Sequence, residues 1–186
     1  IQPLSYAFGL AHAAVQFGAM IHTQSPVLSY QYKGRQWHIV TPQGRVTANR
    51  LIVATNAYGE SSSDCAGEGV AYSKSEHGSK KAYFTPVSYC QFATQPLTAK
   101  QQEMILPQGE GCWDTAQVMS SFRLDHTGRL IIGGLGSLED TGAQTHVNWA
   151  HRQLHALFPN IKAYEFDYMW SGHIAMTADK LPKIGA

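Results

Sequence analysis

The sequence lacks the features that mark several large classes of protein. Charged residues make up only 15% of the 186 positions and the formal net charge is +1. Lys and Arg are scattered, so no basic face is available to displace counterions from a nucleic acid. No apolar run approaches the roughly 20 residues that cross a bilayer as a helix, and no secretory leader is recognisable. We therefore expect neither a nucleic-acid partner nor a membrane span.

Cysteine is also scarce, and the few cysteines follow no metal or disulfide pattern. The three are Cys65, Cys90 and Cys112, with no C-x-x-C pair. An odd number without such a pair is typical of a reducing compartment, which favours a cytoplasmic location. A zinc site needs about four ligands at motif spacing. The nine histidines offer only His151-x3-His155, for which a solvated helix face is the better interpretation, so no metal site is predicted.

The sequence has no G-x-G-x-x-G, the Gly-rich turn with which open α/β sheets bind a dinucleotide phosphate. The nearest stretch is "GGLGS", Gly133 to Ser137. It follows a predicted strand, but helix-forming sequence does not begin until about residue 145, so a turn requiring positive φ is the better interpretation. On its residues alone the chain has no dinucleotide fingerprint.

Hydrophobic residues make up 44% of the chain, enough for a packed core. The apolar spacing of residues 3–17 predicts a helix that begins at Pro3 and ends before Gly18. A short strand is expected at 20–22, and residues 25–55 are predicted to form a β-meander. The run 51–54 predicts a strand buried on both faces, as in a parallel sheet. No other run here could pair with it, so either its partners lie in sequence outside this chain or it is arranged differently.

Residues 59–81 are dominated by Gly, Ser, Glu, Asp and Lys, which predicts a loop or insertion. Beyond it, strands are expected at 83–94, 118–124, 130–134 and 163–170, with a hairpin turn at 126–128 and one helix at 145–158. The predicted fold class is α+β: an antiparallel sheet with a helix on one face, preceded by a partial α/β domain made of a helix, the meander and one return strand. The expected boundaries are 1–58, 59–81, 82–180 and 181–186.

Five stretches, in this order along the chain, resemble the D-amino-acid oxidase superfamily of FAD-dependent oxidoreductases, and are most similar to its γ-glutamylputrescine oxidoreductases. They are "IQPLSYAFGLAHAAVQFGAMIH", "SPVLSYQYKGRQWHIVTPQGRVTANRLIVATNAY", "TPVSYCQFATQPL", "SSFRLDHTGRLIIGGLGS" and "WSGHIAMTADKLPKIG". That family has a Gly-rich segment at each end, and both are absent here. The resemblance therefore implies an internal part of a longer enzyme, and an insertion at 59–81 longer than relatives usually carry.

The resemblance also implies contacts with FAD. Val27 would lie against the adenosine through its backbone, and Ala54, Thr55 and Asn56 would pass near the nucleotide at the end of a strand, where open α/β sheets bind ligands. Plain strand packing is the alternative for these positions. Gly172 would permit close approach to the flavin, and Gly185 belongs to the same returning segment. Residues 170–176 contain no cysteine, which excludes covalent attachment there, and this chain alone is expected not to retain FAD.

For the substrate, the resemblance implies that Trp170 walls the cavity above the flavin. The stretch resembles a motif of the family members that oxidise amino acids, W-x-G-x-R. The resemblance implies that the arginine of this motif makes a bidentate contact with the substrate carboxylate. Here that position is Ile174, so the substrate lacks an α-carboxylate or another residue holds it. Arg123 is one candidate, with a surface arginine as the alternative. His173 is either a polar cavity residue or faces solvent.

These observations favour an amine or polyamine derivative over a free α-amino acid. The expected reaction is FAD-dependent oxidation of a primary or secondary amine, γ-glutamylputrescine-like, to an imine, with reoxidation by dioxygen. No side chain must act as a base if the amine arrives neutral, so no catalytic residue is predicted. The alternative function is a binding or interaction module that has lost catalysis.

Overall fold

The computed structural model describes residues 2–58, 84–116, 119–139, 141–161 and 165–182. Within them the chain forms two compact units. The first contains Pro3–Thr85 and Met176–Ala186, and the second contains Pro86–Ala175 together with Gln2. The predicted loop at 59–81 falls outside the described residues, and the assignment of the two parts to cofactor and substrate stays a prediction.

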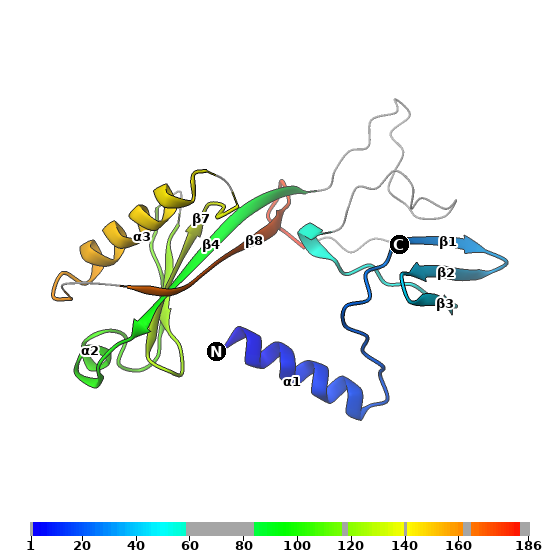
Figure 1. Ribbon diagram of the computed structural model, residues 1–186, viewed down its shortest axis with the longest axis horizontal. Helices are drawn as coiled ribbons and strands as arrows, with labels where there is room; N and C mark the ends of the chain where they lie inside the picture. Colours follow the sequence, from blue (N-terminus) through cyan, green and yellow to red (C-terminus); the bar gives the residue numbers. More distant parts are fainter. Residues whose placement is uncertain (1, 59–83, 117–118, 140, 162–164, 183–186) are drawn as a thin grey trace. The chain divides into compact units, whose positions relative to one another are not determined.

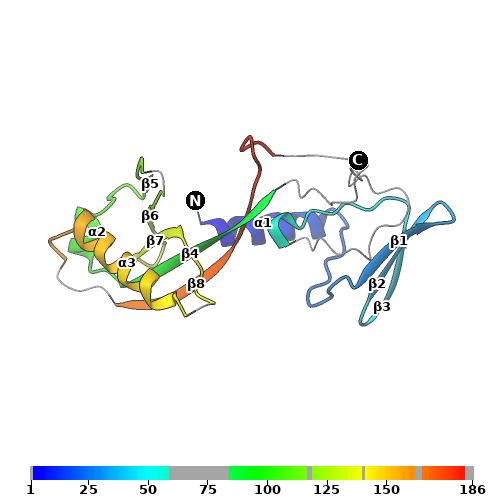
Figure 2. The same cartoon turned by 90° about the horizontal axis from the view of Figure 1, so that it is seen from above.

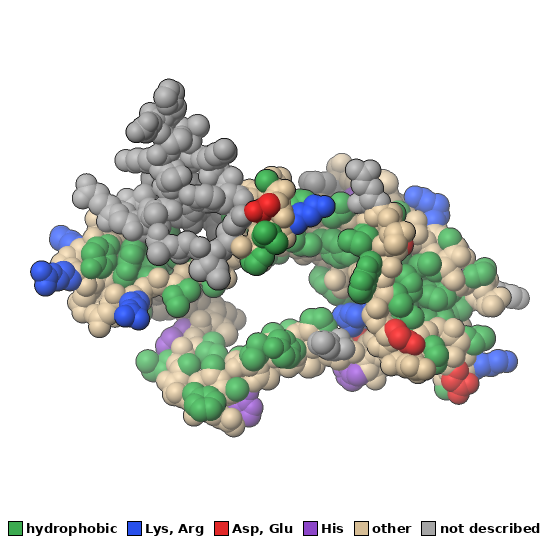
Figure 3. Space-filling view, turned by 180° about the vertical axis from the view of Figure 1, so that it is seen from behind, with side chains coloured by type: hydrophobic (Ala, Val, Ile, Leu, Met, Phe, Trp, Pro, Cys, Tyr) green, Lys and Arg blue, Asp and Glu red, His purple; other side chains and the backbone are tan. Residues whose placement is uncertain are grey.

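Helix α1 (Pro3–Gln16) opens the first unit and confirms the predicted helix. It ends in a Schellman motif, because Ala19 N–H donates to Ala14 O (3.0 Å) and Gly18 N–H donates to Val15 O (2.9 Å). Gly18 has a φ of +90°, which glycine adopts without a Cβ clash. No residue of α1 is buried, and Figure 3 shows hydrophobic side chains exposed along it.

The strand expected at 20–22 is absent, since these residues have no regular structure. Met20 is 85% exposed, and a short apolar segment that packs against nothing has no partner ladder to hold it extended.

The predicted meander is present as a three-stranded antiparallel sheet of β1 (Ser29–Lys33), β2 (Gln36–Thr41) and β3 (Gly44–Ala48). Between β1 and β2, Gly34 and Arg35 both have positive φ (60° and 67°), as a two-residue type I′ turn requires. Ile39 of β2 is the buried hydrophobic residue of this sheet among those described.

The return strand predicted at 51–54 is not formed. These residues have no regular structure, and a short 3₁₀ helix, η1 (Asn56–Tyr58), follows them. Ile52 is 87% exposed. A strand needs a neighbour for its N–H and C=O groups, and none of the described strands lies beside this run. Within this chain the run is irregular, and partner strands outside the chain stay the alternative that the sequence left open.

The second unit is a five-stranded sheet in the order β5-β6-β7-β4-β8. The strands are β4 (Thr85–Pro96), β5 (Gly111–Trp113), β6 (Ser121–Leu124), β7 (Arg129–Leu135) and β8 (Phe166–Met176). The pairs β5–β6, β6–β7 and β7–β4 are antiparallel, and Figures 1 and 2 show β8 running back alongside β4. The predicted antiparallel sheet is therefore confirmed, but the short edge strand β5 was not predicted, and β4 and β8 continue beyond their predicted ends at residues 94 and 170.

Helix α3 (Ala143–Leu157) covers one face of this sheet, as predicted (Figure 1). Side chains alternate along a strand, so every second residue of β4 and β7 points to the helix. The shared core consists of Cys90, Phe92, Leu130 and Ile132 from the sheet with Ala150 and Leu154 from α3, all with no exposed surface. A second helix, α2 (Ala99–Met104), is held by a capping box between Thr98 and Gln101.

Candidate functional site

The face of the five-stranded sheet opposite α3 carries the polar and aromatic side chains that the core does not use. Its residues alternate with the core residues along β4 and β7, so Ala93 and Ile131 point to this face, where the two are also register partners. At Gly133 an added Cβ would lie 2.7 Å from the Tyr89 ring, so the missing side chain makes room for that ring. We call this surface the open face.

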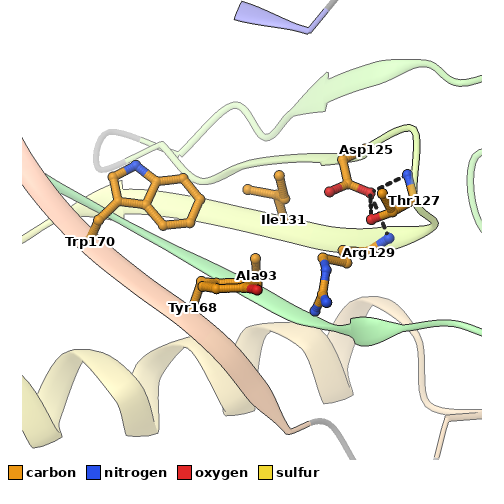
Figure 4. A pocket seen from close by; sticks show the side chains of 7 residues that line it. All are labelled: Ala93, Asp125, Thr127, Arg129, Ile131, Tyr168 and Trp170. Carbon is orange, nitrogen blue, oxygen red and sulfur yellow. Dashed lines mark hydrogen bonds between the residues drawn. The ribbon is translucent and has the colours of Figure 1, made fainter. Parts of the chain in front are cut away.

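A cavity of about 490 Å³ lies on the open face (Figure 4). Its walls come from four segments of the chain. They are Ala93 of β4, Asp125 and Thr127 of the β6–β7 hairpin, Arg129 and Ile131 of β7, and Tyr168 and Trp170 of β8. The cavity therefore combines two aromatic rings, a carboxylate and a guanidinium.

Asp125 organises the hairpin turn. Its Oδ1 accepts hydrogen bonds from Thr127 N (2.8 Å), Thr127 Oγ1 (2.8 Å) and Arg129 N (2.9 Å). Burial would raise the pKa of the Asp125 carboxyl, but the hydrogen bonds from Arg129 and Thr127 more than offset it and lower that pKa below its usual value. Gly128, with a φ of +81°, completes the turn. Asp125 is thus a fixed negative charge at neutral pH.

Arg129 lies at the wall between β7 and β8. Its Nη1 donates to Asp167 Oδ2 in an ion pair and to Thr94 O at 2.9 Å. Its Cζ lies 4.9 Å from the centre of the Tyr168 ring, a cation–π contact. The hydrogen bond to Asp167 raises the pKa of Arg129 above its ordinary value. The guanidinium is therefore permanently charged, and a carboxylate beside it balances that charge.

Strand β8 carries the predicted substrate residues. Trp170 lines the cavity and is 43% exposed, and Ile174 is 45% exposed further along the same strand. Between the two, Ser171 accepts a hydrogen bond from Leu138 N and His173 contacts Ser88, so alternation in this part of the strand puts Trp170, Gly172 and Ile174 on the opposite face. His173 has the opposite parity: its Nδ1 lies 3.4 Å from Ser88 Oγ, and it does not line the cavity.

Arg123 is half-buried on β6, where it is the register partner of Ile131 of β7. Its parity puts it on the open face, next to the cavity but not in its wall. Its Nη1 donates to Gln2 Oε1 at 3.4 Å. The structure therefore brings Trp170 to the cavity and leaves Arg123 beside it.

The predicted FAD residues of the first unit are exposed. They are Val27, Ala54, Thr55 and Asn56, while Gly185 lies outside the described residues. Asn56 has a φ of +50°, a conformation that Asn tolerates better than most residues, and Tyr58 N–H closes the turn on Thr55 O (3.0 Å). A small side chain at Ala54 and an exposed backbone are compatible with close approach of a nucleotide, and contact of these residues with FAD stays a prediction.

The sequence did not indicate Asp125, Thr127, Arg129 or Tyr168 as site residues. The hairpin was interpreted only as a turn, and the ion pair of Arg129 links positions far apart in the chain. The parity of Tyr168 with Trp170 along β8 was the signal that could have found one of them. In the part of the chain that the structure describes, no group of three metal-ligating side chains is found, and no helix is long and apolar enough to cross a membrane.

The family model described as "DAO: FAD dependent oxidoreductase" matches residues 1–186. The chain belongs to this family. The resemblance predicted from the five stretches is thereby confirmed.

The relatives of this DAO-family chain are all longer than it. It is 29% identical over 185 residues to the probable oxidoreductase OrdL of Haemophilus influenzae, covering 100% of the chain and 40% of the relative. It is 26% identical over 182 residues to the OrdL of Rhizobium meliloti, covering 98% of the chain and 39% of the relative. It is also 26% identical over 188 residues to the γ-glutamylputrescine oxidoreductase of Escherichia coli, covering 100% and 40%. The chain thus spans about two fifths of these relatives.

Among solved structures, glycine oxidase from Geobacillus kaustophilus superposes on 96% of the DAO-family chain and 44% of its own, with a TM-score of 0.64 at 20% identity. At this identity the likeness shows the fold alone. It confirms the mixed α/β architecture with antiparallel sheets.

Proposed function

We propose that the protein carrying this chain oxidises a primary or secondary amine, γ-glutamylputrescine-like, rather than a free α-amino acid. The observation that carries the proposal is Ile174. It lies exposed on β8, an even number of residues from Trp170. In the motif of the amino-acid oxidases that this stretch resembles, the same position is an arginine. An isoleucine side chain cannot bind a carboxylate, whereas it can pack against the methylene groups of an amine.

The roles of the other residues follow from their places. Trp170 would form an apolar wall that excludes water from the amine, and Gly172 would let the flavin approach the strand. Val27, Ala54, Thr55, Asn56 and Gly185 would contact FAD. When bound, FAD would supply the two-electron oxidation of the amine to an imine with dioxygen as the final electron acceptor, and water would hydrolyse the imine to an aldehyde. The residues at the site would position a neutral amine, with no side chain needed as a base.

The test is anaerobic flavin bleaching in the FAD-loaded parent protein. We expect alkyl amines and diamines to reduce the flavin, and glycine or other free α-amino acids to reduce it at least about a hundredfold more slowly, because the charge-assisted contact to the carboxylate is missing. Rapid reduction by free amino acids would refute the amine assignment, and absence of reduction by any amine would favour the non-catalytic alternative.

Ile174→Arg tests the residue that carries the proposal. We expect the variant to gain activity on α-amino acids while its activity on amines falls, because a guanidinium on the open face supplies the missing carboxylate contact and repels a cation. Ile174→Leu is the matched control, since it keeps the apolar character and size and should retain the amine preference. An arginine variant with unchanged substrate preference would show that Ile174 does not face the substrate.

A further inference from the structure

One oxygen of the Asp125 carboxylate is left for a ligand. All three hydrogen bonds that Asp125 accepts from the turn go to Oδ1. None of the described residues donates a hydrogen bond to Oδ2. In Figure 4 the oxygen without dashed lines points away from the turn, toward Ile131 and the cavity. The turn therefore fixes the carboxylate with one oxygen and presents the other to the cavity.

The charge balance of the cavity favours a cation. The fixed charges in its wall are Asp125 and Arg129, and Arg129 is paired with Asp167. Because Asp167 neutralises Arg129, the charge of Asp125 is left unbalanced within the wall. Arg123 lies beside the cavity on the same face, where its Nη1 donates to Gln2 Oε1. The Arg129 guanidinium also lies over the Tyr168 ring, which holds it at the wall. Asp125 Oδ2 is then the polar atom of the cavity with an unmet charge.

The remaining wall suits the stem of an alkyl ammonium. Trp170, Ile131 and Ala93 line the cavity beside Asp125, and apolar and aromatic surfaces pack against methylene groups while an indole face attracts a cation. A volume of about 490 Å³ accommodates a short alkyl chain with a charged end.

We propose that Asp125 Oδ2 binds an ammonium group at the non-reacting end of the substrate, with Trp170 against the alkyl stem. The substrate class is then an amine with a second, distal cationic group. This assignment rests on the proposed amine oxidation and narrows it. It also gives the structure a means of selecting long cationic substrates over simple monoamines.

The test uses the FAD-loaded parent protein with its flavin reduced by dithionite under argon, so that amines bind without turnover. Calorimetry at about pH 8 gives Kd for diaminobutane, aminobutanol and aminobutanoate. These share one amine and differ in the distal group. We expect diaminobutane to bind about tenfold more tightly than aminobutanol, as one charge-assisted hydrogen bond implies.

Asp125→Asn should abolish that preference, because the amide keeps an Oδ1 acceptor for the turn but replaces Oδ2 with a donor. Asp114→Asn is the matched control: Asp114 accepts hydrogen bonds from Ala116 and Ser120 in another turn of the same unit and does not line the cavity. It should leave the preference unchanged. If Asp125→Asn does not fold, the salt dependence of binding to the wild type is the test. The affinity for diaminobutane relative to that for aminobutanol should fall as NaCl is added, because salt screens the contact of the distal ammonium with Asp125.

Three outcomes would overturn the ammonium site. They are equal binding of diamine and alcohol, tighter binding of aminobutanoate, which would assign the site to Arg129 and a carboxylate, and an unchanged preference in Asp125→Asn. If the protein prefers the diamine but no amine reduces its flavin, the proposed oxidation is wrong and the ammonium site is supported. If amines reduce the flavin but the diamine is not preferred, the proposed oxidation is supported and the ammonium site is wrong.

Discussion

At the scale of single residues, the closest packing in the second unit depends on a missing side chain. Gly134 of β7 lies under α3, and a Cβ there would be 2.4 Å from Trp149 Cη2 and 2.8 Å from its Cζ2. We predict that Gly134→Ala lowers the free energy of unfolding by about 1–3 kcal/mol, because the indole must leave its position. Urea denaturation followed by circular dichroism measures this.

Gly111→Ala is the matched control for that substitution. Gly111 also lies in a strand of the same sheet, has no positive φ and has open space around its Cα. Its substitution should leave stability nearly unchanged. Equal losses in the two variants would mean that the contact with Trp149 does not determine the requirement for glycine.

The sequence predicted site residues only where the family motif covers them. Trp170 lines the cavity of the open face, and its expected contact with the substrate stays a prediction. Asp125 was missed because the sequence pattern of the turn accounts for the hydrogen bonds to its Oδ1. The pattern does not predict where the Oδ2 atom points. Arg129 was missed because its partners, Asp167 and Thr94, come from strands that become neighbours only in the folded sheet.

At the scale of elements, the packing of α3 on β8 depends on a neutral imidazole. His151 of α3 stacks against Phe166 of β8, with ring centres 4.5 Å apart. Burial lowers the pKa of His151, and the nearby His155 lowers it further. The unfolded chain, with a histidine pKa near 6.5, therefore takes up this proton more readily than the folded one.

We predict that this site makes the protein less stable as the pH falls below about 6.5, down to the lowered pKa of the folded state, and has no effect above it. His151→Gln should remove that part of the pH dependence, and His155→Gln should weaken it. Urea unfolding at a series of pH values between neutral and mildly acidic measures all three proteins. An identical slope in wild type and His151→Gln would contradict the prediction.

Local patterns predicted the elements that are stabilised locally. Helix α1, the meander with its Gly34-containing turn, and α3 all follow from spacing and turn residues. The strand at 51–54 failed because a strand depends on neighbours, which no local pattern supplies. Helix α2 was missed although its capping box, Thr98-x-x-Gln101, was readable in the sequence. The helix has only six residues and no apolar stripe, so it is too short to show a helical periodicity in the sequence.

At the scale of the whole molecule, we predict that this 186-residue chain, purified by itself, does not retain FAD through gel filtration. The sequence has no G-x-G-x-x-G, so the N–H donors that hold a pyrophosphate are missing, and Val27 and Ala54 can supply only part of a contact. The flavin absorbance of the eluted protein is the measurement, with the parent protein as control. A yellow chain with stoichiometric flavin would contradict it.

The family and the architecture of the second unit were predictable at this scale, because five motifs in order constrain each other more than any one does. The extent was predictable in the same way: the expectation of a longer enzyme agrees with coverage of 40% of the relatives. The substrate was not, since it depends on a few side chains on one face of a sheet.

The two faces of the five-stranded sheet also differ in how well their positions tolerate substitution during evolution. Residues that point to α3, such as Phe92 and Leu130, have no exposed surface, and most substitutions there would be lost to unfolding. Their immediate chain neighbours on the open face, such as Ala93 and Arg129, line the cavity without holding the helix. Descendants of this sequence can therefore acquire new ligand preferences by single substitutions at alternate positions, while selection on the intervening positions keeps the scaffold constant.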